Sequence, residues 1–135
     1  MSVNIGINPL TWTNDDLPEL GAEISLEQCL SEGKKAGYAG FELGQKFPRE
    51  LEQLQAVIKP FQLEIISGWY SARLLERSVE DEIEAMKDHL ALLKGMGCKV
   101  MVFAEVSGCI HGNLNSALSK RPTLAANEWL EFGKN

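Results

Sequence analysis

Glu42 is a carboxylate placed near the end of a short apolar stretch, AGYAGFELG at residues 36–44. A charged group in a buried strand costs free energy unless a hydrogen-bonding partner, an opposite charge or water stabilises it. Two interpretations fit this pattern: Glu42 caps a strand end in solvent, or it lines the mouth of a pocket. The other polar and aromatic side chains help to choose between them.

Similar side chains follow the other apolar stretches of the chain. Glu105, for example, comes directly after VMVFA at residues 100–104. In parallel α/β folds, ligands bind at the carboxyl ends of the strands. Carboxylates can orient hydroxyl groups, and a tryptophan face suits the C–H side of a sugar ring. We therefore expect a site for a polyhydroxylated small molecule, with these substrate-binding candidates: Asn8, Trp12, Glu42, Trp69, Glu105 and His111.

Each of these residues also has a purely structural interpretation. Trp12 and Trp69 could pack in the core or at its rim. His111 lies in the glycine-rich segment GCIHGN, where it could be a surface residue or a metal ligand. His89 lies off the apolar stripe of its predicted helix and is expected to be solvated.

The elements that must position these residues follow a regular rhythm. Strands are predicted at residues 5–10, 40–43, 63–66 and 99–104, with an amphipathic helix in each interval. Ser25 and Gln28 have capping-box spacing at the start of the first helix. The third helix is expected to bury one apolar stripe: Val79, Ile83, Met86, Leu90 and Leu93.

This βαβαβαβ order indicates a parallel α/β fold. Apolar strands without alternation, separated by amphipathic helices, are typical of a parallel sheet that helices cover. We expect four parallel strands in sequential order with the helices on one side, because such crossovers are right-handed. Residues 1–135 are expected to form one domain.

Composition narrows the classes of partner. The net charge is −6 and the isoelectric point is near 4.9, which argues against nucleic acid or an anionic membrane as a partner. The odd number of cysteines, three without a C-x-x-C pair, favours a reducing cytoplasm over a disulfide framework. The start of the sequence has no signal-peptide pattern.

Five local strings resemble one family. They are NPLTWTNDDLPELG at 8–21, GFELGQKFP at 40–48, SGWYSARLL at 67–75, AEVSGCIHG at 104–112 and RPTLAANEWLEFG at 121–133. Together they resemble the inosose dehydratases of myo-inositol catabolism, in the xylose-isomerase-like superfamily. The resemblance implies a (β/α)8 barrel and removal of water from 2-keto-myo-inositol to give a trihydroxycyclohexane dione. It also implies a divalent manganese or cobalt ion, with glutathione as a possible further cofactor.

Length sets this chain apart from such a barrel. A closed (β/α)8 barrel typically needs about 250 residues, whereas this chain has 135 residues and four predicted strands. We therefore expect an incomplete (β/α) domain, the amino-terminal four strands of a TIM barrel, whose metal ligands lie in the absent carboxy-terminal half and not in this chain. The activity is expected of the full-length protein, and the chain alone is expected to be inactive and to self-associate through its open sheet edges.

Three alternatives remain open at this point. A sugar or ketose isomerase or epimerase of the same superfamily would return the proton to a neighbouring carbon instead of expelling hydroxide. A non-catalytic half-barrel would associate with another chain. A metal-dependent DNA-repair nuclease on the same barrel fits least well, because the chain is acidic and has no basic stripe.

Overall fold

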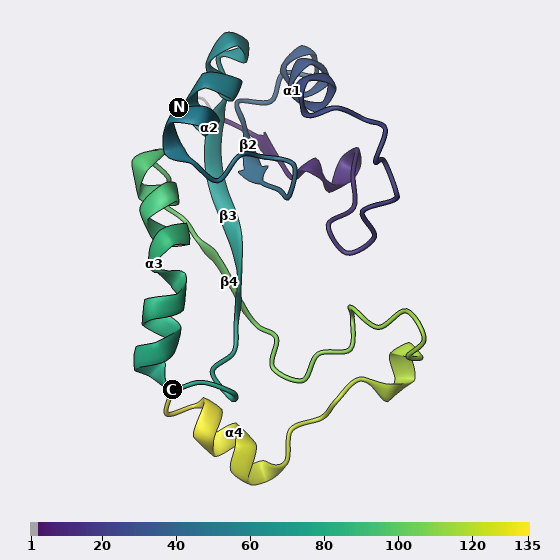
Figure 1. Ribbon diagram of the computed structural model, residues 1–135, viewed down its shortest axis with the longest axis vertical. Helices are drawn as coiled ribbons and strands as arrows, with labels where there is room; N and C mark the ends of the chain where they lie inside the picture. Colours follow the sequence, from purple (N-terminus) through teal and green to yellow (C-terminus); the bar gives the residue numbers. More distant parts are fainter. Residues whose placement is uncertain (1–2) are drawn as a thin grey trace. The chain divides into compact units, whose positions relative to one another are not determined.

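The computed structural model describes residues 3–135 and alternates strands with helices (Figure 1). Short 3-10 turns lie at Pro9–Thr11, Lys59–Phe61 and Leu118–Lys120. The main elements are β1 (Gly6–Ile7), η1 (Pro9–Thr11), α1 (Leu26–Lys35), β2 (Gly40–Leu43), α2 (Leu51–Ile58), β3 (Glu64–Ala72), α3 (Val79–Gly95), β4 (Val102–Glu105) and α4 (Ala126–Phe132).

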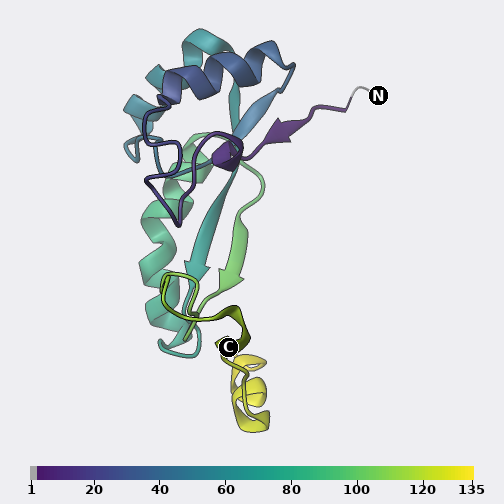
Figure 2. The same ribbon diagram turned by 90° about the vertical axis from the view of Figure 1, so that its right-hand side faces the viewer.

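The strands form one sheet in the order β1-β2-β3-β4. β1 pairs with β2 in parallel, and β2 pairs with β3 in parallel. Figure 2 shows β4 beside β3, pointing in the same direction. The predicted parallel α/β fold with sequential strand order is therefore confirmed. The bounds differ from the prediction mainly in β1, which is shorter, and in β3, which extends through Ser67-Gly-Trp-Tyr.

The described residues divide into two compact units. The first contains residues 3–69 and 88–102, and the second contains residues 70–87 and 103–135. β3 and α3 each contribute residues to both units, so each unit has its own part of the sheet and its own part of α3.

The hydrophobic core belongs to the first unit. Phe41 and Leu43 of β2 and Ile65 of β3 are buried there. Helices α1, α2 and the last turns of α3 contribute Cys29, Leu30, Leu54, Ile58, Leu92 and Leu93 to the same cluster. Helices therefore cover the face of β2 that carries Phe41 and Leu43. Because side chains alternate along a strand, Glu42 lies on the opposite face.

Helix α1 begins where the sequence predicts it. The Ser25 hydroxyl accepts a hydrogen bond from the Gln28 amide at 3.1 Å, which satisfies one free donor of the first turn. The reciprocal half of the capping box does not form, because the Gln28 side chain donates to Glu32 Oε1 instead. The cap is thus a single hydrogen bond.

Gly33 of α1 makes room for the Phe41 ring. A Cβ at Gly33 would lie 2.4 Å from Phe41 Cζ, and Phe41 is fully buried. Gly33→Ala is therefore expected to lower the free energy of unfolding by about 1–3 kcal/mol through overpacking. Urea denaturation of the 135-residue chain measures this, with Gly112→Ala as the control because a Cβ at Gly112 meets nothing within 4 Å. Equal stability of the two variants would contradict this packing.

The buried face of α3 differs from the predicted stripe. Ile83 and Leu90 are about half exposed, whereas Glu82 is 1% exposed. The prediction is wrong here because it assigned the buried face to apolar residues alone. Hydrogen bonds stabilise the Glu82 carboxylate in the second unit, and they allow the helix to turn that side inward.

His89 is also placed differently from the prediction. It is half-buried rather than solvated, and it lies against β3: a Cβ at Gly68 would meet the ring's Cε1 and Nε2 at 3.1 and 3.2 Å. Burial lowers the pKa of His89 below its ordinary value. Gly68 therefore provides the space in which this imidazole packs.

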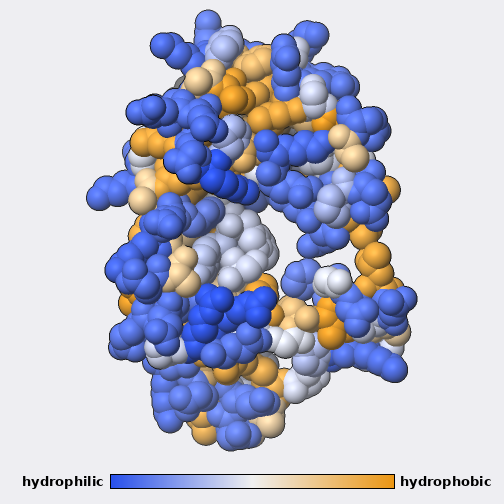
Figure 3. Space-filling model, viewed as in Figure 1, coloured by the Kyte–Doolittle hydropathy of each residue, from blue (hydrophilic) through white to orange (hydrophobic). Residues whose placement is uncertain are grey.

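The face seen in Figure 3 carries apolar side chains scattered among polar ones. In the second unit, Leu114, Leu118, Trp129 and Leu130 are each more than half exposed. The expected self-association stays a prediction. Among the helices of residues 3–135, none is long and apolar enough to cross a bilayer.

Candidate functional site

A strand irregularity brings Glu42 and Ser67 together in the first unit. Phe41 pairs with Ile65, but Glu42 pairs with Ser67, so β3 has one extra residue between the two pairs. Such a bulge re-aims side chains. Here it places Ser67 on the face of Glu42, and the Ser67 hydroxyl donates a hydrogen bond to Glu42 Oε2 at 2.8 Å.

Asn8 completes this cluster from the end of β1. Its Nδ2 donates to Glu42 Oε1 at 2.6 Å. Its Oδ1 accepts from the Leu10 amide at 2.9 Å, which caps the 3-10 turn η1. The cap fixes which end of the Asn8 amide faces Glu42. The predicted candidates Asn8 and Glu42 are thus in direct contact, and we call Asn8, Glu42 and Ser67 the Glu42 cluster.

Gly6 and Gly40 leave space for the Ile66 side chain beside the Glu42 cluster. A Cβ at Gly6 would lie 2.0 Å from Ile66 Cδ1, and one at Gly40 would lie 2.7 Å from Ile66 Cγ2. Ile66, the extra residue of the bulge, therefore lies across β1 and β2 on the face that carries Glu42. This packing accounts for the glycine that begins GFEL.

Trp69 belongs to the same face by alternation. Gly68 lies against Leu93 and His89 on the helix-covered side, so the next side chain of the strand points the other way. Trp69 is 52% exposed. The first unit thus presents carboxylate, amide, hydroxyl and indole groups on one face of three adjacent strands.

Trp12 does not join this cluster. Its ring packs against Phe41 with centroids 5.7 Å apart, and its Nε1 donates to Glu32 Oε2 at 2.6 Å. Trp12 therefore extends the core toward helix α1. These contacts match the packing interpretation of this residue.

Glu105 and His111 lie in the second unit. Glu105 Oε2 accepts from the Leu74 amide and Oε1 accepts from the Ser107 amide, both at 2.7 Å. Both carboxylate oxygens of Glu105 thus accept hydrogen bonds from backbone amides just after the ends of β3 and β4. His111 is exposed in the loop that follows β4. Their roles in substrate binding stay predictions.

Glu82 anchors the same β3–α3 connection from the buried side. The Tyr70 hydroxyl donates to Glu82 Oε1 at 2.5 Å, and the Arg73 amide donates to Oε2 at 2.9 Å. Arg77 forms an ion pair with it at 3.4 Å. Burial alone would raise the pKa of Glu82, but the Tyr70 and Arg73 hydrogen bonds and the charge of Arg77 outweigh it and lower the pKa.

This lowered pKa predicts loss of stability in acid. A carboxyl whose folded pKa lies below its ordinary value of 4.5 stabilises the fold above pH 4.5. That contribution is lost as the pH falls through the folded pKa. Urea denaturation between neutral and acid pH is expected to show a steeper loss for the native chain than for Glu82→Gln. Parallel pH profiles of the two proteins would contradict this role.

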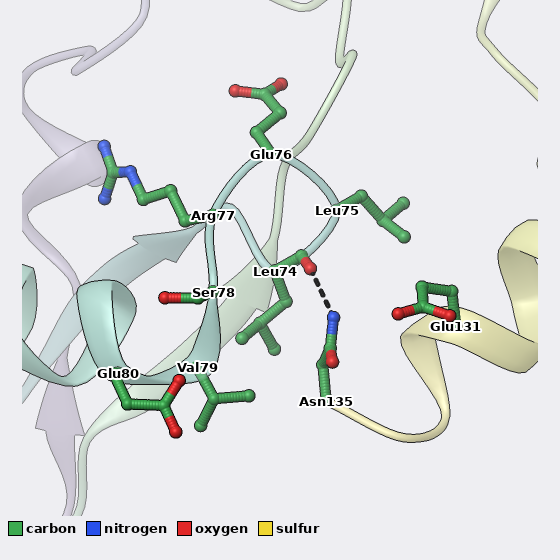
Figure 4. Close-up of a pocket in the computed structure, with 9 residues that line it drawn as sticks. All are labelled: Leu74, Leu75, Glu76, Arg77, Ser78, Val79, Glu80, Glu131 and Asn135. Atoms are coloured by element: carbon green, nitrogen blue, oxygen red, sulfur yellow. Dashed lines mark hydrogen bonds between the residues drawn. The ribbon is translucent and has the colours of Figure 1, made fainter.

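The second unit also contains an open pocket of about 590 Å³. It lies between the β3–α3 connection and the end of the chain, where Asn135 Nδ2 donates to the Leu74 carbonyl at 2.8 Å (Figure 4). None of the six candidate residues lines it. The candidate site is therefore better defined by the Glu42 cluster than by this hollow.

The described residues do not fit a divalent metal site by themselves. Within residues 3–135, no group of three His, Cys, Asp or Glu side chains is arranged to hold a metal ion. Glu42 and Glu105 are engaged with the neutral donors described above.

Sequence reasoning missed Ser67 and Glu82. Ser67 follows the predicted third strand directly, but only the bulge turns it toward Glu42. Glu82 resembles an ordinary acidic residue in the first turn of a helix. The aromatic and basic residues of WYSARLLER at 69–77 were the available signal for its partners, and no spacing rule connects them to it.

Comparison with known proteins supplies independent information. No family model matches the sequence. The rhizopine catabolism protein MocC of Rhizobium meliloti is 49% identical over 134 residues, which is 99% of this chain and 41% of that protein. The inosose dehydratase of Geobacillus thermodenitrificans is 43% identical over 128 residues, 94% of this chain and 43% of that protein. The inosose dehydratase of Bacillus anthracis is 41% identical over 129 residues, which is 95% of this chain and 43% of that protein.

A solved structure shares the fold. The apo 3-keto-D-glucoside 4-epimerase YcjR from E. coli aligns with a TM-score of 0.53 at 12% identity, covering 98% of this chain and 49% of that one. The chain thus spans about two fifths of the length of the curated relatives it matches. The predicted resemblance is confirmed: along nearly all of its residues, this chain is a homologue of the inosose dehydratases and of MocC.

Proposed function

We propose that this chain is the part of a dehydratase that holds the hydroxyl groups of an inosose. An inosose is a cyclic polyhydroxyketone such as 2-keto-myo-inositol. The observation that carries this proposal is the Glu42 cluster, a carboxylate fixed by Asn8 and Ser67 at 2.6 and 2.8 Å. It occurs in a chain that is 41–43% identical to proteins named inosose dehydratase.

The cluster has free capacity for two hydroxyls. Each oxygen of an ionised carboxylate can accept about two hydrogen bonds. Asn8 donates one to Glu42 Oε1, and Ser67 donates one to Glu42 Oε2. Two adjacent hydroxyls of a ring can therefore each donate to one oxygen of Glu42. Trp69 and Ile66 offer apolar surface for the C–H face of the same ring.

The reaction itself is an elimination. A base removes the proton alpha to the ketone, the C–H electrons form an enolate, and a neighbouring hydroxyl leaves as water after a general acid protonates it. Glu42 holds and orients the ring in this scheme, so that the departing hydroxyl is aligned. In this proposal, the manganese, cobalt or glutathione that the resemblance implies belongs to the full-length protein.

A chimera tests the proposal. The 128 residues of the Geobacillus enzyme that match this chain are replaced by the corresponding residues of this chain, and the product formed from 2-keto-myo-inositol is analysed by mass spectrometry. We expect a product lighter by one water. A folded chimera that returns only substrate would contradict the proposal, and a product of unchanged mass would favour the epimerase or isomerase alternative. The 135-residue chain alone is expected to show no turnover.

A further inference from the structure

Lys46 makes an unusual set of contacts in the first unit. Its Nζ lies 2.7 Å from the Gly21 carbonyl, 3.2 Å from that of Ala22 and 2.5 Å from that of Ile24. An ammonium group has three N–H donors. All three can therefore be directed at one short stretch of backbone.

A neighbouring residue holds the other end of the same segment. Gln45 Nε2 donates to the Asn14 carbonyl at 2.8 Å, and the Asn14 amide in turn donates to the Leu20 carbonyl at 3.2 Å. Gly21 has φ +76°, and a Cβ there would lie 2.0 Å from the Trp12 carbonyl oxygen. Residues 14–24 therefore form a loop that folds back on itself, and the β2–α2 connection holds both of its ends.

The loop and the Glu42 cluster share their supports. The loop leaves η1, whose cap is Asn8, and the Thr13 amide donates to the Pro9 carbonyl at 3.1 Å. On the other side, Lys46 lies four residues after Glu42, in the connection that follows β2. Movement of the loop against this connection would therefore shift Asn8 relative to Glu42.

We propose that Lys46 is a positioning residue whose ammonium group fixes the 14–24 loop and thereby keeps Asn8 against Glu42. The effect on substrate binding rests on the proposed function, whereas the effect on the loop does not. Because three carbonyl oxygens converge on one ammonium, the structure also predicts that a small primary ammonium ion can replace the side chain when it is truncated.

Hydrogen exchange measured by mass spectrometry on the 135-residue chain tests the loop directly. In Lys46→Met, amides of residues 14–24 are expected to exchange about tenfold faster, while those of α2 stay near their native rates. Lys35→Met, which removes the same charge from an exposed helix position, serves as the matched control. Unchanged exchange at 14–24, or an equal rise at 14–24 and in α2, would overturn the positioning role.

Chemical rescue provides the second measurement. Methylammonium added to Lys46→Ala is expected to slow exchange at residues 14–24, whereas tetramethylammonium, which has no N–H donor, is not. In the chimera, Lys46→Met is expected to raise KM for the inosose about tenfold with a smaller change in kcat. If methylammonium does not slow exchange at residues 14–24 in Lys46→Ala, the role of the ammonium group is overturned, whatever the dehydratase activity of the chimera. A chimera without dehydratase activity but with the expected exchange pattern would contradict the proposed function alone.

Discussion

Glu42→Gln in the chimera is expected to lower kcat/KM for 2-keto-myo-inositol by about a hundredfold. The substitution keeps the size of the side chain but removes its charge and replaces one acceptor with a donor. Two hydrogen bonds from substrate hydroxyls to a charged oxygen, each about 1.5 kcal/mol, together account for a loss of this size. Steady-state kinetics with the inosose measures it.

Stability separates this role from a structural one. Glu42 is only partly buried, and a glutamine side chain in its place can still accept from Asn8 or Ser67, so the melting temperature is expected to change little. Glu64→Gln is the matched control, because Glu64 is an exposed glutamate at the start of β3. If Glu42→Gln loses stability but keeps native kinetics, Glu42 is a strand-end residue and not a substrate ligand.

Glu82→Ala is expected to lower the free energy of unfolding of the 135-residue chain by about 3 kcal/mol. Glu82 is 1% exposed, and removing its carboxylate leaves the donors that face it without an acceptor, at about 1–3 kcal/mol for each buried group. Here Arg77 loses its partner, and the Tyr70 hydroxyl and the Arg73 amide lose an acceptor. Urea denaturation measures the difference.

A nearby residue provides the control for Glu82. Glu80 is an exposed glutamate in the same first turn of α3, so Glu80→Ala is expected to change stability by less than about 0.5 kcal/mol. Equal losses in the two variants would show that only the interaction with the helix dipole matters. In that case the buried network would not account for the structure of the β3–α3 connection.

The fold was predictable because its signals are local. Continuous apolar stretches such as VMVF and a serine three residues before a glutamine describe strands and a helix start without knowledge of distant contacts. The predicted stripe of α3 failed for the opposite reason. Burial of Glu82 depends on Tyr70, Arg73 and Arg77, and no pattern within the helix records those partners.

The candidate site was predictable only in part. The position of candidates at strand ends placed Asn8 and Glu42 at the same rim, because carboxyl ends of neighbouring parallel strands meet at one edge, and the structure shows the two side chains in contact. Strand-end position could not find Ser67, whose direction depends on a bulge. It also could not find Lys46. This lysine binds backbone carbonyl groups, which every residue type has, so the sequence does not indicate its partners.

The most direct test of the central claim is a crystal structure of the chimera with myo-inositol bound as a non-reacting polyol. We expect a hydroxyl oxygen of the ligand within about 3.2 Å of each carboxylate oxygen of Glu42, with Asn8 and Ser67 still bonded to the same carboxylate. A bound ligand whose hydroxyls all lie beyond hydrogen-bond reach of Glu42 would contradict the claim.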